Sequence, residues 1–63
     1  MEFGENLRRI RLEKKISQVE LASKIVVSNS YVCDMEMGRS TPSMKTLKKI
    51  ANALQVEVKD LFA

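Results

Sequence analysis

The chain has 63 residues with one Cys and no His, which predicts a single domain (1–63) with neither an intrachain disulfide nor a Cys/His metal site. Its 11 basic and 8 acidic residues give a formal net charge of +3, and this modest basicity favours polyanionic partners. No apolar run approaches the roughly 20 residues that span a bilayer, and the first residues lack the pattern of a signal peptide, so we expect a cytoplasmic protein without a membrane partner.

Helical periodicity runs through nearly the whole sequence, and no stretch alternates apolar and polar residues as a strand would. We therefore predict an all-α fold. Its five helices are expected over residues 3–14, 18–25, 29–37, 44–54 and 57–62. Apolar residues at helical spacing predict the core, which should contain Phe3, Leu7, Ile10, Leu21, Ala22, Ile25, Val32, Met35, Leu47, Ile50, Ala51 and Leu54.

Serine residues mark the expected starts of three helices. The second helix should begin at a capping box, in which the Ser17 hydroxyl accepts from the Glu20 amide and the Glu20 carboxylate reaches back. Ser28 and Ser43 are expected to cap the third and fourth helices. Gly38 should end the third helix in the left-handed conformation, which glycine adopts at little cost.

The connection between the second and third helices is the most informative stretch. Only residues 26–28 separate the two helices, and so short a connection makes them cross steeply. Close crossing needs a small residue, which Ala22 supplies. The outward face of the third helix then carries Asn29, Ser30, Cys33, Asp34 and Met37. The free amides and the dipole of its polar first turn favour anions, so this turn can approach base edges and phosphates.

Several segments together carry a family resemblance. They are Ser17-Gln18-Val19-Glu20-Leu21-Ala22, Val27-Ser28-Asn29-Ser30-Tyr31-Val32, Glu36-Met37-Gly38-Arg39 and Pro42-Ser43, followed by Leu47, Ile50, Ala51 and Leu54. In this order and spacing they resemble the Cro and phage-repressor type of helix-turn-helix domain, also called the xenobiotic-response-element family. The resemblance covers Phe3 to Phe62. It implies a lambda-repressor-like DNA-binding domain with a helix-turn-helix core at about 18–37.

The resemblance also implies roles for single residues. Gln18 occupies the position that contacts a phosphate and braces a side chain of the recognition helix. Ser28, Asn29, Ser30 and Asp34 occupy positions that face bases or nearby phosphates. The physical chemistry agrees for Asn29, because Asn can pair with adenine N6 and N7. Asp34 can accept from cytosine N4, or it can exclude other sequences because nearby phosphates repel its charge.

Further contacts are expected around this surface. Tyr31 can stack on a sugar, bond a phosphate or touch a thymine methyl. Arg39 and Lys45 flank the loop before the fourth helix and are expected to contact phosphates, whereas the other basic residues are expected to be solvated surface. The family pairs an Arg on the first helix with a Glu near the end of the third, here Arg11 and Glu36. This pair either directs Arg11 to a phosphate or is a structural ion pair only, and both alternatives stay open.

Three positions depart from the family pattern. The family usually has Gly where this chain has Val26, and often has Gly at the positions of Lys15 and Gln55. A β-branched residue with positive φ is a costly outlier. Val26 is therefore expected to adopt another conformation or to extend the second helix, which would change the tilt of the recognition helix. The ends at Lys15 and Gln55 must be closed without glycine, at about 1 kcal/mol each.

We expect a sequence-specific transcriptional regulator, a repressor in particular, that binds a palindromic DNA operator as a homodimer. The expected dimer interface lies in the C-terminal region, at Val56, Val58, Leu61 and Phe62. The alternative is a protein-interaction module such as an antitoxin-type helix-turn-helix protein. We do not expect an enzyme, a cofactor or a small-molecule ligand, since the chain offers no nucleophile–base pair and no glycine-rich phosphate loop.

Overall fold

The computed structural model describes residues 2–62, so the two ends of the predicted domain 1–63 lie outside the described residues. Within this range the chain forms four α-helices and one short 3-10 helix, and no strand. The elements in chain order are α1 (Glu2–Glu13), α2 (Gln18–Ile25), α3 (Asn29–Glu36), α4 (Met44–Leu54) and η1 (Val58–Phe62). The all-α prediction is confirmed.

The fifth predicted α-helix, 57–62, is wrong in type. This segment is the 3-10 helix η1, only five residues long. The Asp60 amide donates to the Glu57 carbonyl at 2.9 Å, an i to i−3 bond, and the Asp60 carboxylate accepts from the Glu57 amide at 2.9 Å. Because these bonds tighten so short a segment, it takes 3-10 rather than α geometry.

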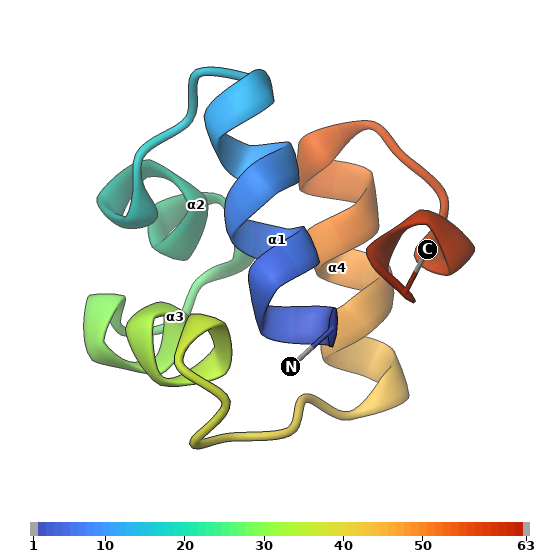
Figure 1. Cartoon of the computed structure of the whole chain (residues 1–63). Coiled ribbons are helices and arrows are strands. Elements are labelled where there is room, and N and C mark those ends of the chain that lie inside the picture. The colour runs from blue at the N-terminus through green and yellow to red at the C-terminus, as the bar shows by residue number, and fades with distance from the viewer. Residues whose placement is uncertain (1, 63) are drawn as a thin grey trace.

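The helices enclose one core with α1 at its centre. Figure 1 shows α1 between the α2–α3 pair on one side and α4 with η1 on the other. α1 packs on α3 and η1, while α2 packs on α3 and α4. The buried hydrophobic residues of this core are Leu7, Ile10, Leu21, Ala22, Ile25, Val32, Met35, Leu47, Ile50, Ala51, Leu54 and Leu61. All but one of the residues expected in the core are therefore buried; the exception, Phe3, is half-buried against it.

The three predicted serine caps are confirmed. The hydroxyls of Ser17, Ser28 and Ser43 accept from the amides three residues further on, at 3.0, 3.1 and 3.2 Å. Each bond satisfies an amide that the first turn of a helix leaves without a backbone partner. Gly38 has the expected positive φ of 80°.

Three helices end in left-handed residues that are not glycine. Lys15, Val26 and Gln55 have φ values of 60°, 60° and 59°. The Val27 amide donates to the Ala22 carbonyl at 3.0 Å, and the Val26 amide donates to the Ser23 carbonyl at 3.3 Å. This bond pair closes the helix only if Val26 is left-handed. The expectations that Val26 avoids this conformation or extends the helix are wrong, because the turn geometry overrides the residue's own preference.

The left-handed Val26 predicts a stabilising substitution. Val26→Gly should raise the free energy of unfolding by about 1 kcal/mol, which corresponds to roughly 4–8 °C in Tm for a domain of this size. The reason is that glycine relieves the strain, and little packing is lost because Val26 is 84% exposed. Thermal unfolding followed by circular dichroism measures the change. Lys15→Gly is the matched control, with a smaller gain because Lys is not β-branched; an equal or larger gain there would contradict the strain argument.

No helix in the described part of the chain is both long and apolar enough to cross a membrane.

Candidate nucleic-acid interface

The crossing of α2 and α3 sets the orientation of the candidate site. Ala22, the small residue expected at this crossing, is buried on α2 with 4% of its surface exposed. Leu21, Ile25, Val32 and Met35 are buried around it. With these side chains turned inward, the opposite face of α3 is turned to solvent, so the packing of α2 decides which residues α3 presents.

The first turn of α3 is exposed and polar. Asn29 and Ser30 are exposed, and Tyr31 is half-buried against the core. The hydroxyl of Ser28 accepts from the Tyr31 amide, and no acidic residue stands in this turn. The positive end of the helix dipole is therefore not neutralised locally, which favours the approach of an anion such as a phosphate.

The other end of α3 is held by a buried cluster around Glu36. Arg11 Nε donates to Glu36 Oε2 at 2.7 Å and Arg11 Nη2 to Oε1 at 3.2 Å, with side chains only 6% and 2% exposed. Arg11 Nη1 also donates to the Ile16 carbonyl at 2.8 Å, and Gln18 Nε2 to Glu36 Oε1 at 3.0 Å. The Glu36 carboxylate thus joins α1, α2 and α3.

This cluster bears on the two alternatives for Arg11. Its guanidinium is buried and bonded to two protein groups, so it could reach a phosphate only by leaving Glu36. The expected pair with Glu36 is present, and the burial favours a structural role for Arg11 over the predicted contact with DNA. Gln18 is half-buried and braces α3 through Glu36, which agrees with the bracing part of its expected role.

Arg8 also lies beside Glu36, although it was not predicted from the sequence to belong to the candidate site. Its Nη1 lies 4.0 Å from Glu36 Oε1, and its side chain is 63% exposed. Arg8 and Arg11 stand three residues apart in α1, so they share one face of the helix. That spacing was the signal available in the sequence. The position gives Arg8 the exposed guanidinium that Arg11 lacks.

Asp34 and Arg39 form an exposed ion pair at the edge of α3. Arg39 Nη1 lies 3.7 Å from Asp34 Oδ1, with side chains 66% and 40% exposed. The Arg39 amide donates to the Asp34 carbonyl at 2.8 Å, which keeps the loop close to the helix. Exposed pairs of this kind contribute little, so both side chains can exchange partners. Lys45 is exposed in the first turn of α4, where no acidic residue stands.

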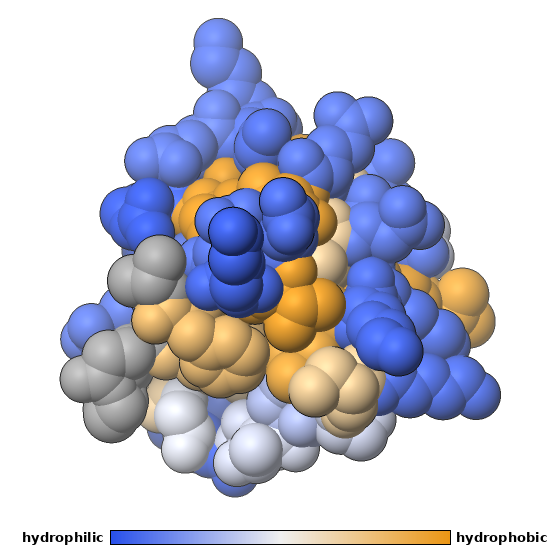
Figure 2. Space-filling view, turned by 90° about the vertical axis from the view of Figure 1, so that its right-hand side faces the viewer, coloured by the Kyte–Doolittle hydropathy of each residue, from blue (hydrophilic) through white to orange (hydrophobic). Residues whose placement is uncertain are grey.

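The residues expected at a dimer interface differ strongly in exposure. Leu61, which was expected at the interface, is fully buried in the chain's own core and presents no surface to a partner. Val56 and Val58 are half-buried against the core, and Phe62 is 52% exposed. Figure 2 shows the face that carries α4 and η1, where an apolar area is bordered by hydrophilic side chains. Only part of the expected interface is therefore available to a partner.

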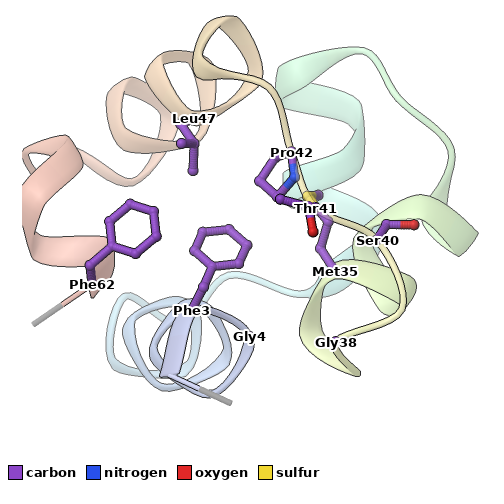
Figure 3. A pocket seen from close by; sticks show the side chains of 9 residues that line it. All are labelled: Phe3, Gly4, Met35, Gly38, Ser40, Thr41, Pro42, Leu47 and Phe62. Atoms are coloured by element: carbon purple, nitrogen blue, oxygen red, sulfur yellow. The ribbon is translucent and has the colours of Figure 1, made fainter.

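A pocket of about 230 Å³ opens beside Phe62. The rings of Phe3 and Phe62 meet there with centroids 5.5 Å apart and planes inclined by 32°. Figure 3 shows both rings facing Leu47, with Pro42 and Met35 further along the wall. The lining is mainly apolar, so the pocket extends the apolar surface around Phe62.

Four helices around one core, with a three-residue turn between α2 and α3, define a helix-turn-helix domain. A helix-turn-helix family model matches residues 7–61, and the chain belongs to this family. The chain is 43% identical over 58 residues to the immunity repressor protein of Bacillus phage phi105. That match covers 92% of this chain and 40% of the repressor, so the chain spans about two fifths of that relative's length.

Two solved structures show the same fold. The restriction-modification controller protein C.AhdI from Aeromonas hydrophila superposes with a TM-score of 0.93 at 38% identity, covering 97% of this chain and 92% of that one. The biofilm master regulator SinR, solved in complex with DNA, superposes with a TM-score of 0.89 at 34% identity, covering 97% and 98%. The three relatives are thus named as a repressor, a controller protein and a master regulator.

Proposed function

We propose that this chain is a sequence-specific DNA-binding transcriptional regulator, a repressor, that places the first turn of α3 in the major groove. The observation that carries the proposal is the asymmetry of α3. Its first turn is exposed, polar and free of acidic residues, while its last residue, Glu36, is held in a buried cluster. A rigidly held helix with an exposed N-terminal turn is what groove reading requires. A regulator of this kind acts on DNA in the cytoplasm.

Specific side chains are suited to the two parts of the task. Asn29 and Ser30 are exposed where base edges would lie, and the Asn29 amide can pair with adenine N6 and N7. Arg39, Lys45 and Arg8 are exposed cations that can clamp the phosphates on either side. Base contacts would then select the sequence, and phosphate contacts would supply most of the affinity.

We further propose that the chain binds as a homodimer. One recognition helix reads only a few base pairs, and a two-fold dimer matches two half-sites about 34 Å apart. The surface that supports a dimer is the apolar area at the contacting rings of Phe3 and Phe62, together with the half-buried Val56 and Val58 and without the buried Leu61. Symmetry of the operator is the consequence that can be tested.

Selection of bound sequences from a random duplex library tests the proposal. We expect enrichment of a palindrome with half-sites about one helical turn apart. Affinity for the enriched duplex should then fall steeply with salt, because phosphate contacts release counterions. A library without any enriched sequence, or an affinity that stays flat between low and moderate salt, would contradict DNA recognition; enrichment of single, unpaired half-sites would contradict the dimer alone.

A further inference from the structure

The start of α1 approaches the end of α3 unusually closely at Gly4. A Cβ atom placed on Gly4 would lie 2.5 Å from the Glu36 carbonyl oxygen and 2.7 Å from that of Met35. Contacts below 3.0 Å are essentially never made by real Cβ atoms. Both neighbours are backbone atoms, which cannot rotate away as a side chain can. Figure 3 shows Gly4 on α1 beside the end of α3.

α1 therefore meets the last turn of α3 at two levels. At Gly4, the distance of closest approach is set by the carbonyl groups of Met35 and Glu36. Two helical turns further along α1, Arg11 pulls the Glu36 carboxylate inward. One contact limits the approach and the other attracts, and both act on Glu36. Together they fix where the last turn of α3 sits.

We propose that Gly4 is a positioning residue for DNA recognition, because it sets the angle at which α3 presents its first turn. This inference rests on the proposed function. An added Cβ would have to separate α1 from α3 at this contact by at least about 0.5 Å, the difference between 2.5 and 3.0 Å. When the last turn of the eight-residue α3 takes up this shift while α2 holds the rest of the helix, α3 tilts and the position of Asn29 changes.

Base reading and phosphate binding differ in their tolerance of such a tilt. Bidentate base contacts require side chains held within about 0.5 Å of their working geometry. Attraction to phosphates is long-ranged and independent of sequence. A small tilt of α3 should therefore lower specific binding and leave non-specific binding nearly intact, which a mere loss of stability would not do.

Gly4→Ala tests this role, with Gly38→Ala as the matched control. Gly38 has a φ of 80°, so alanine is strained at that position, but an added Cβ there meets nothing within 4 Å. Both variants are titrated in folded form with the selected operator and with a scrambled duplex. We expect Gly4→Ala to lower the ratio of specific to non-specific affinity about tenfold or more, the scale of one lost base contact, and Gly38→Ala to leave the ratio within about twofold.

An unchanged ratio for Gly4→Ala, or an equal loss for Gly38→Ala, would overturn the positioning role. If Gly4→Ala alone does not fold, the comparison is made in the Val26→Gly background, with Val26→Gly as its reference. A wild-type chain that selects no DNA would refute the proposed function instead. In that case amide chemical shifts of the free protein decide: a positioning role requires Gly4→Ala to shift residues 29–36 throughout, whereas shifts confined to the contact at Glu36 refute it.

Discussion

Glu36→Ala is expected to lower the free energy of unfolding by about 3–5 kcal/mol, because Arg11 would remain buried without its charged partner. The total stability of a domain of this size is on the order of 3–9 kcal/mol, so a large share of it would be lost. Arg11 would keep only its bond to the Ile16 carbonyl. Urea unfolding followed by circular dichroism measures the change.

Two control variants distinguish the cost of leaving a buried charge unpaired from the cost of losing an exposed ion pair. Glu13→Ala removes a partner from the exposed Arg9–Glu13 pair, whose atoms lie 3.4 Å apart, and should cost less than about 1 kcal/mol. The double variant Arg11→Met with Glu36→Leu should be more stable than Glu36→Ala, because it leaves no buried charge unpaired. If Glu36→Ala costs no more than Glu13→Ala, the buried cluster does not hold α3.

Asn29→Ala is expected to weaken operator binding by about 1–3 kcal/mol and to relax the preference at one base position. The Asn29 side chain is exposed, so its removal should not disturb the fold. Fluorescence titrations with the operator and with duplexes altered at single positions measure both effects. Binding to a scrambled duplex should be unchanged, since no phosphate charge contact is removed.

Asn52→Ala supplies the matched control for this substitution. Asn52 is also an exposed asparagine on a helix, but it stands on α4, which packs on α2 and η1. Its replacement should change neither affinity nor base preference. A loss of affinity equal to that of Asn29→Ala, or unaltered base preference in the Asn29 variant, removes Asn29 from the reading surface.

Local signals in the sequence predicted most of the fold. The three serine caps and the apolar residues at helical spacing specify where helices start and which faces are buried, because both act within a few residues. The conformation of Val26 could not be predicted this way. It is fixed by hydrogen bonds that close α2, and these outweigh the preference of a β-branched side chain.

Parts of the candidate site that depend on tertiary contacts escaped the sequence. The pairing of Arg11 with Glu36 was expected, but its burial, which removes Arg11 from the surface, depends on how α1 and α3 pack. Leu61 was predicted at a partner surface because a short segment at the end of the chain was expected to bury few apolar residues. In the structure, the core of the same domain covers Leu61. The role of Gly4 arises from backbone atoms 31 and 32 residues away in the chain, at Met35 and Glu36, which no local pattern reveals.

The last turn of α3 anchors the helix in the core, whereas its first turn is exposed to solvent. Residues that anchor the helix, such as Met35 and Glu36, are covered, whereas Asn29 and Ser30 have no part in the hydrophobic core. Under the proposed function, substitutions at Asn29 and Ser30 should therefore change the preferred target sequence while the core that holds the helix stays folded.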